Sequence, residues 1–202
     1  MSSQTYRVLN QLYTEKLPAI LVLNKIDKLV TQCQMDPMQA FQHLSQIIEH
    51  VNAILGSFIA KEIGTQETKM NENDEPIDAL ESHFYFSTEK KNVVFASALD
   101  NWGFSIENFS PLIAKKLGKK PEEIEKYLWG EWYFNPKLKS FSDKPRNEND
   151  RPVCVDLILK QIWDVIENVQ NDNMEKIDKV VTALRIKISD GARKAKGWAL
   201  IK

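Results

Sequence analysis

The stretch Leu17–Asp27 reads LPAILVL followed by NKID, a run of mostly branched apolar residues and then a largely polar tetrapeptide. Such a run predicts a strand buried on both faces of a parallel sheet, because a strand covered by helices on each side lacks polar alternation. Ligands of open α/β sheets bind beyond the carboxyl ends of the strands. Since Asn24, Lys25 and Asp27 follow this strand directly, we predict an α/β fold with a binding site at its end.

The carboxylate of Asp27 has the chemistry that guanine recognition requires. It can accept hydrogen bonds from both the ring N–H and the exocyclic amino group of guanine. Adenine would leave it unpaired, at a cost of about 1–3 kcal/mol for each missed bond. We expect Asn24 to bridge the base edge to neighbouring backbone, and the aliphatic stem of Lys25 to lie over the purine face. The competing interpretation is an ordinary turn after a strand.

A second apolar run, VVFA at residues 93–96, predicts another buried strand, and Ser97-Ala98-Leu99 follows it. The tripeptide by itself carries no information. Guanine-nucleotide-binding proteins, however, place a similar turn at the corresponding strand end, where a backbone N–H reaches the guanine carbonyl. The small side chain of Ala98 keeps that approach open. Because both motifs follow a predicted strand in the same order, we predict a site formed by Asn24, Lys25, Asp27, Ser97, Ala98 and Leu99.

Helices are predicted on both sides of these strands. Asp36-Pro37 should open one of about six turns, with Asp as its cap and Pro at its first position. Its apolar stripe has steps of three and four and consists of Phe41, Leu44, Ile48, Val51, Leu55 and Phe58. Further helices are predicted over 5–15, from Pro121, over 153–169 and over 174–184. Two polar loops are predicted, an acidic one over 62–82 and another over 142–152.

Composition narrows the class of protein. Lys and Arg number 27 against 28 Asp and Glu, so the overall charge favours no nucleic acid, and we predict no sequence-specific nucleic-acid binding. The two Cys, at 33 and 154, and the three His lack ligand spacing, so we predict neither a metal site nor a disulfide framework. No apolar run is long enough to span a bilayer, and the polar N-terminus does not resemble a signal peptide. We expect a cytoplasmic protein with no membrane partner.

In the order of these motifs, the chain resembles translational GTPases of the elongation factor two family. The resemblance covers about residues 4–190, and its ribosome-maturation branch of elongation factor-like GTPases is the most similar. The stretch FYFS before VVF and the acidic insertion are similar to that branch. The shared segments are Gln4-Thr5, Val8-Leu9-x-Gln11, Asn101-Trp102-Gly103-Phe104, Leu128-Trp129-Gly130-x-x-Tyr133-Phe134-Asn135-Pro136 and Leu157-Ile158-Leu159, with the helix around Ile177-Asp178-Lys179.

The resemblance implies that the chain binds GTP or GDP and that its parent protein uses Mg²⁺. It also implies GTP-driven release of an anti-association factor from the immature large ribosomal subunit, helped by a Shwachman–Diamond-type protein. Two alternatives stay open. One is an elongation factor two-type translocase, and the other is a non-catalytic module that docks on the ribosome through residues 101–190.

The phosphate-binding half of a GTPase is not found in the sequence. No G-x-x-x-x-G-K-[ST] segment occurs, and the chain contains only seven Gly. Asp100-Asn101-Trp102-Gly103 matches a switch pattern but in the wrong order, so we assign it to a subdomain junction. We therefore expect no catalytic residues, no Mg²⁺ ligands and no GTP hydrolysis by this chain alone.

The predicted domain organisation has three parts. Residues 1–100 would form an incomplete P-loop GTPase-type sheet, the C-terminal part of a translational-GTPase domain. Residues 101–190 would form a second, smaller α/β subdomain of the inserted type. Residues 191–202 depart from the family pattern and are expected to be a divergent tail.

Overall fold

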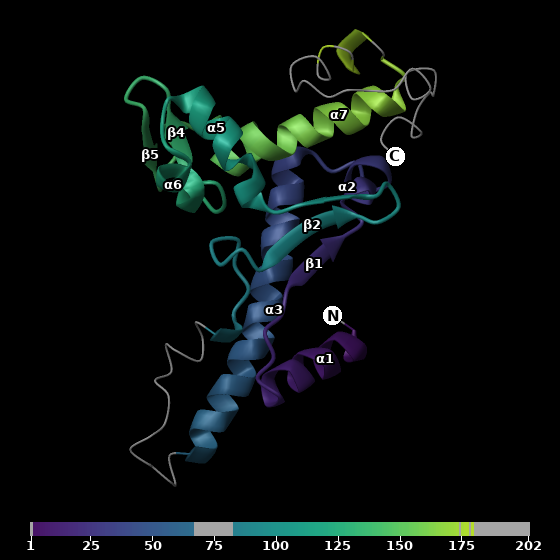
Figure 1. Cartoon of the computed structure of the whole chain (residues 1–202), viewed down its shortest axis with the longest axis vertical. Coiled ribbons are helices and arrows are strands. Elements are labelled where there is room, and N and C mark those ends of the chain that lie inside the picture. Colours follow the sequence, from purple (N-terminus) through teal and green to yellow (C-terminus); the bar gives the residue numbers. More distant parts are fainter. Residues whose placement is uncertain (1, 67–82, 174, 178, 180–202) are drawn as a thin grey trace.

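The computed structural model describes residues 2–66, 83–173, 175–177 and 179. They form a small sheet with a long helix behind it and further helices at its ends (Figure 1). The arrangement is α/β, as predicted. The elements are α1 Ser3–Thr14, β1 Leu21–Asn24, α2 Ile26–Thr31, α3 Pro37–Gln66, β2 Val93–Ser97, β3 Trp102–Phe104, α5 Ser110–Leu117, α6 Pro121–Ile124, β4 Tyr133–Asn135, β5 Ser140–Ser142 and α7 Lys160–Gln170, with short 3₁₀ or π-helical turns at 106–109, 125–127 and 155–159.

The main sheet has the order β1–β2–β3. Strands β1 and β2 are parallel, with Leu23 opposite Phe95 and Asn24 opposite Ala96. Strand β3 returns antiparallel to β2 after a tight turn at residues 98–101. Because β1 and β2 run in the same direction, their carboxyl ends meet at one edge of the sheet. Both motifs found in the sequence follow those ends.

Helix α3 connects β1 to β2 and is the longest element in the described residues. Oδ1 of Asp36 accepts from the amides of Met38 at 2.7 Å and Gln39 at 3.0 Å. The side chain of Gln39 in turn accepts from the amide of Asp36, which completes a reciprocal cap. The whole predicted apolar stripe is buried, as predicted.

Helix α3 extends past its predicted end. It reaches Gln66, so residues 62–66 of the predicted acidic loop belong to the helix instead. Their backbone continues the ladder of the preceding turns, and acidic composition alone does not end a helix. The remainder of that loop, residues 67–82, lies outside the described residues.

Strand β1 corrects the prediction of a strand covered on both faces. It begins at Leu21 rather than Leu17, since the amide of Leu17 still donates to Leu12 and completes the end of α1. Leu23 is only 8% exposed, whereas Ile20 and Val22 are 64% and 54% exposed. Among the described elements, α3 packs against one face of the sheet, so alternate residues of β1 face away from the core (Figure 1).

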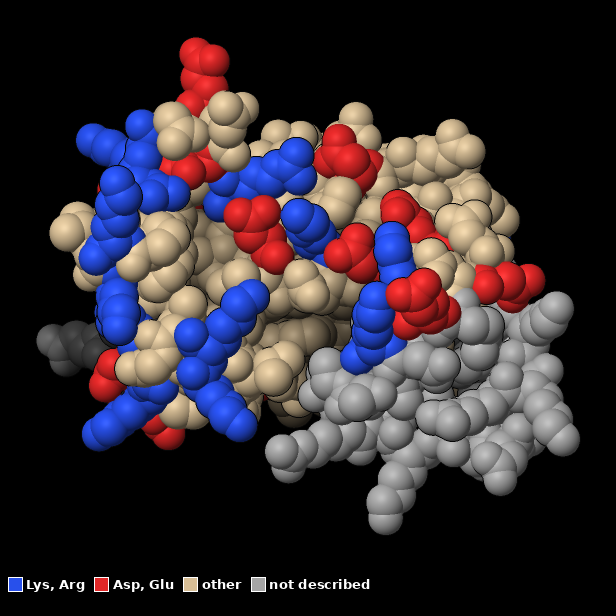
Figure 2. Space-filling view, turned by 90° about the horizontal axis from the view of Figure 1, so that it is seen from above, with Lys and Arg blue, Asp and Glu red and all other residues tan. Residues whose placement is uncertain are grey.

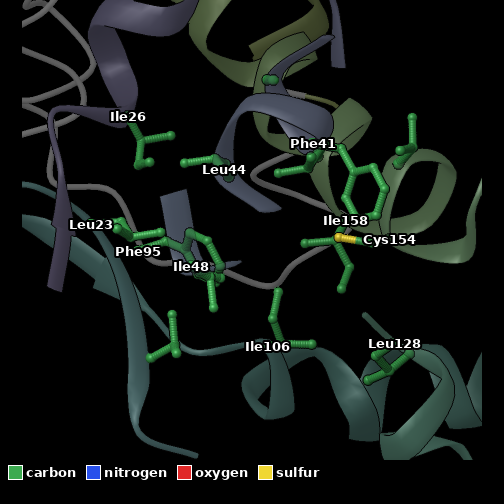
Figure 3. Packing of buried hydrophobic residues seen from close by; sticks show 14 of the residues in the cluster. Leu23, Ile26, Phe41, Leu44, Ile48, Phe95, Ile106, Leu128, Cys154 and Ile158 are labelled. Carbon is green, nitrogen blue, oxygen red and sulfur yellow. The ribbon is translucent and has the colours of Figure 1, made fainter. Parts of the chain in front are cut away.

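The buried side chains form one hydrophobic cluster that includes both the sheet and the later helices. Leu23 and Phe95 of the sheet point toward Ile48 of α3, and Cys154 and Ile158 lie near Phe41 (Figure 3). Trp129 joins these parts, with its ring centroid 5.1 Å from those of both Phe41 and Phe95. Hydrophobic burial therefore fixes the later helices against α3 and the sheet.

A second, two-stranded sheet is formed by β4 and β5, with Phe134 opposite Phe141. The predicted helices from Pro121 and over 153–169 are present, the second as a π-helical turn followed by α7. The domain division at residue 100 stays a prediction, although β3 extends the first sheet beyond it. The predicted helix over 174–184 and the tail over 191–202 lie largely or wholly outside the described residues. No helix among the described residues is long and apolar enough to cross a membrane.

Candidate functional site

The turn that leaves β1 is set by the backbone of Lys25. This residue adopts the left-handed conformation, with φ 72° and ψ 34°, and lies between the last strand residue and the first residue of α2. Its amide donates to Oδ1 of Asn24 at 2.7 Å. This local bond stabilises a conformation that non-glycine residues seldom adopt. The chain therefore reverses sharply and brings Asp27 into the first turn of α2.

Asn24 joins the two motifs directly. Its Oδ1 also accepts a hydrogen bond from the amide of Ala98, at 2.9 Å. The two residues are 74 positions apart in the sequence. Parallel pairing of β1 with β2 aligns the strand ends, and this side-chain bond then fixes the spacing between the two turns. The structure thus brings residues 24–27 and 97–99 together at one edge of the sheet.

Beside Asp100, Asp27 is the second buried acid that lines the cavity of the site. Its side chain is 4% exposed and lines a cavity of about 340 Å³. Within the part of the chain that the structure describes, no hydrogen bond or ion pair to this carboxylate is found. Neither oxygen of Asp27 is among the enclosed polar atoms that lack a partner, so both open onto the cavity. Its acceptors are therefore available for a ligand that carries donors.

Four of the six predicted site residues are exposed, namely Asn24, Lys25, Ala98 and Leu99. Leu99 is 67% exposed and lines the same cavity as Asp27. Lys25 is exposed but does not line that cavity, and neither does Asn24. The cavity thus reaches Asp27 from the side of α2 and α7, and Asn24 and Lys25 lie beyond its rim.

The sequence predicts that a backbone N–H of the 97–99 turn reaches a base carbonyl, but the amide of Ala98 is not free to do so. It donates to Asn24 instead. In the described chain no acceptor is found for the amide of Leu99, the next residue of the turn. Leu99 therefore supplies the available backbone donor.

Ser97 has a structural place in the site. It is fully buried, and its Oγ donates to Oδ2 of Asp100 at 2.8 Å while accepting from the Asp100 amide at 3.3 Å. Asp100 is itself 2% exposed. This pair locks the 98–101 turn, so Asp100 and Asn101 form a hairpin connection between β2 and β3. The sequence contains the signal that would have revealed it, a Ser three residues before an Asp at a strand end.

Gln170 was missed by the sequence analysis. Together with Thr31 and Gln32 it forms the outer wall of the cavity. It comes from α7, which is anchored where Trp163 Nε1 donates to the carbonyl of Met35 at 2.7 Å. That bond joins α7 to the connection between α2 and α3. No local pattern in the sequence reveals a contact across 128 or more residues.

Among the described residues, no Cys or His lines this cavity. In residues 2–66 and 83–173 no group of three or more His, Cys, Asp or Glu side chains could hold a metal ion. Burial raises the pKa of the Cys154 thiol well above its ordinary value. Cys154 lies in the hydrophobic cluster, so it is a core residue.

Comparison with known proteins gives consistent similarities. The family described as "Elongation factor Tu GTP binding domain" matches residues 1–183. The chain is 38% identical over 210 aligned residues to "Elongation factor-like GTPase 1" of Homo sapiens, covering 96% of this chain and 19% of that protein. It is 40% identical over 195 residues to "Ribosome assembly protein 1" of Saccharomyces cerevisiae and 39% identical over 189 residues to the protein of that name in Schizosaccharomyces pombe. Each of those two alignments covers 92% of this chain and 18% of the relative, so the chain spans less than a fifth of these proteins.

Proposed function

The chain belongs to the elongation factor Tu GTP-binding domain family, and from this membership we propose that it forms the guanine-recognising part of a ribosome-associated GTPase. The observation that carries the proposal is the unpartnered, buried carboxylate of Asp27 beside Leu99, with Asn24 bonded to Ala98. A carboxylate, a backbone donor and an exposed apolar side chain match the edge and face of a guanine base. We assign the bound cofactor as GTP or GDP.

Each predicted residue has a distinct part in this recognition. Asp27 accepts from the two adjacent donors of guanine, and the amide of Leu99 donates to the base carbonyl. The stem of Lys25 and the side chain of Leu99 cover the base faces. Asn24, Ser97 and Ala98 act indirectly, since their hydrogen bonds fix the two turns. The discrimination against adenine then comes from Asp27, which would lose both partners.

Phosphate and Mg²⁺ binding would involve other residues of the longer proteins that this chain resembles. The described residues contain no suitable metal-ligand cluster, and the 202 residues contain no G-x-x-x-x-G-K-[ST] segment. The residues at this site would therefore contact the base and not the Mg²⁺ ion. Without phosphate contacts, we expect weak nucleotide binding by this chain and no GTP hydrolysis.

The biological setting is proposed from the relatives. Two of them are named "Ribosome assembly protein 1", which favours maturation of the ribosome over elongation of translation. Within that setting we propose GTP-driven release of an anti-association factor from the large subunit, in the cytoplasm, with a Shwachman–Diamond-type protein as partner. This finer assignment rests on the family resemblance, as does the proposed second α/β subdomain over 101–190.

Substitution of Asp27 tests the base specificity. Asp27→Asn should weaken GDP binding at least about tenfold, because the loss of one or two charge-assisted bonds costs about 1–3 kcal/mol each. It should strengthen binding of xanthosine diphosphate, whose ring carbonyl replaces the guanine amino group and accepts from the new amide. NMR titration of the ¹⁵N-labelled chain with each nucleotide measures both changes, even at millimolar affinity.

The matched control is Asp164→Asn, an exposed carboxylate on α7 that should bind both nucleotides as the unsubstituted chain does. In the unsubstituted chain, GDP should shift the amide signals of residues 24–27 and 97–99, and ADP should not. Equal shifts with ADP, or none with GDP, would remove the guanine assignment. A phosphate-release assay on the same sample should detect no Mg²⁺-dependent turnover.

A further inference from the structure

Positive charge is concentrated in one part of the chain. Over the whole sequence acids and bases nearly balance, but residues 110–144 contain eight Lys against five Asp and Glu. Lys and Arg side chains crowd the side of the molecule that carries β4, β5 and α5 (Figure 2). Five of these bases, together with one apolar residue, form what we call the hairpin surface. It is defined as Lys119, Lys126, Lys137, Leu138, Lys139 and Lys144.

The acids of this region lie partly elsewhere. Glu122 and Glu125 line a cavity together with Glu89, Lys91 and Lys126, and Glu125 pairs with Lys91 at 3.1 Å. The charge of Glu125 is thus partly neutralised by Lys91, a base outside residues 110–144. Lys137, Lys139 and Lys144 have no salt bridge within the described residues. Residues 133–144 of the β4–β5 hairpin contain three Lys against one acid, Asp143, so this segment has a surplus of positive charge.

The tip of this hairpin is held in one conformation. Oδ1 of Asn135 accepts from the amides of Lys137 at 3.0 Å and Leu138 at 3.3 Å. Lys139 then adopts the left-handed conformation, with φ 49°, and the chain returns along β5. Leu138 is 74% exposed between the two lysines. The tip thus presents an apolar side chain between two cations on a preformed turn.

A stack of aromatic rings supports the base of the hairpin. The rings of Tyr127 and Phe141 are nearly parallel, with centroids 4.4 Å apart. Nζ of Lys119 lies 5.9 Å from the Phe141 centroid, and Nζ of Lys126 lies 4.8 Å from that of Tyr127. Each ring thus attracts an ammonium group, which restricts both lysines near the surface. Only the fold brings these aromatic residues and lysines together.

We propose that the hairpin surface binds the phosphate backbone of double-helical RNA without reading its sequence. Ammonium groups neutralise phosphates, and the rings already attract lysines, so they are not open platforms for bases. Leu138 is exposed at the tip, so it would contact sugars in the wide, shallow minor groove of A-form RNA while the lysines beside it reach the flanking phosphates. The choice of RNA over another polyanion rests on the proposed function at the ribosome.

Charge reversal at the tip tests this surface. Binding of a fluorescein-labelled RNA hairpin with a long duplex stem to the full chain would be followed by fluorescence anisotropy at several salt concentrations. Lys137→Glu/Lys139→Glu should weaken binding at least about tenfold and reduce the slope of log affinity against log salt by about two. Leu138→Ser should weaken binding without changing that slope.

The matched control is Arg7→Glu/Lys16→Glu, which makes the same change of charge in α1 and just after its end, distant from the hairpin (Figure 1). It should retain most of the RNA affinity. An equal loss in both double variants would overturn the proposal, as would tighter binding of polyglutamate than of RNA. GDP titration of the hairpin variant should match that of the unsubstituted chain. If GDP fails to bind while the RNA results hold, only the guanine assignment falls.

Discussion

At the scale of single residues, the site depends on how four polar side chains are used. The side chain of Asn24 accepts from the amide of Ala98, and the side chains of Ser97 and Asp100 bond to each other. These hydrogen bonds hold the backbone of the two turns in place. Asp27 takes no part in that network and stays without a partner in the described chain. Fixed turns around an unpaired carboxylate are what a preorganised binding site requires, because the cost of ordering is met during folding. The motif predicted which residues gather, and the structure separates those that stabilise the turns from the one left for a ligand.

Removal of the Ser97 hydroxyl should destabilise the protein through Asp100. Ser97→Ala leaves a buried carboxylate without its hydroxyl donor, so the free energy of unfolding should fall by about 1–3 kcal/mol. Urea denaturation measures this change. Ser140→Ala, an exposed serine on β5, should stay within about 0.5 kcal/mol.

The double variant Ser97→Ala/Asp100→Ala makes the reason testable. It should cost less than the sum of the single changes, because the second substitution removes the carboxylate that the first left unpaired. Strict additivity of the two changes would show that the buried pair does not carry the effect.

At the scale of elements, the hydrophobic pattern predicted the buried face of α3 correctly and that of β1 incorrectly. The stripe of α3 was predicted residue by residue, because a period near 3.6 and a capping pair are local properties. The run in β1 was interpreted as covered on both faces, because a run of apolar residues does not show whether one face of the strand or both faces are packed. Only the position of α3 decides that Leu23 is buried and Val22 is not.

The two faces of β1 should therefore respond differently to truncation. Leu23→Ala should lower the free energy of unfolding by about 2–5 kcal/mol, since it opens a cavity against α3. Val22→Ala, one residue away on the same strand, should cost no more than about 0.5 kcal/mol. Thermal and urea denaturation of the two variants provide the comparison. Equal losses would mean that the second face of β1 is packed in solution.

At the scale of the whole molecule, α7 links the later part of the chain to the cavity of Asp27. Trp163 is 2% exposed and bonds to the carbonyl of Met35, and Gln170 at the end of the same helix lines the cavity of Asp27. Helix α7 also packs against α2, the helix that carries Asp27. Residues beyond the predicted boundary at 100 thus form one wall of a site whose motifs all precede that boundary.

Substitution of Trp163 should affect both stability and nucleotide binding. Trp163→Phe removes the donor to Met35, which should cost about 1–3 kcal/mol of unfolding free energy. It should also weaken GDP binding, because α7 would no longer be fixed against α2 and the cavity wall. Denaturation and the NMR titration measure the two effects.

Trp132→Phe provides the comparison, since no hydrogen bond of the Trp132 indole is found in the described residues and this residue lies near β4. It should leave GDP affinity unchanged. If Trp163→Phe also leaves GDP affinity unchanged, α7 is not a functional wall of the site.

The sequence by itself determined several helices, the two parallel strands and the order of the two motifs, because capping residues, apolar periods and the order of residues 24–27 and 97–99 are local properties of the chain. The tertiary structure decided which of those residues stabilise the turns and which keep unbonded acceptors at the cavity. The bond from Ala98 to Asn24, the buried pair of Ser97 and Asp100, and the approach of Gln170 all join positions through folding. Hydrophobic burial positions the helices and strands that carry them, and burial is a property of the packed whole that no short segment of sequence contains.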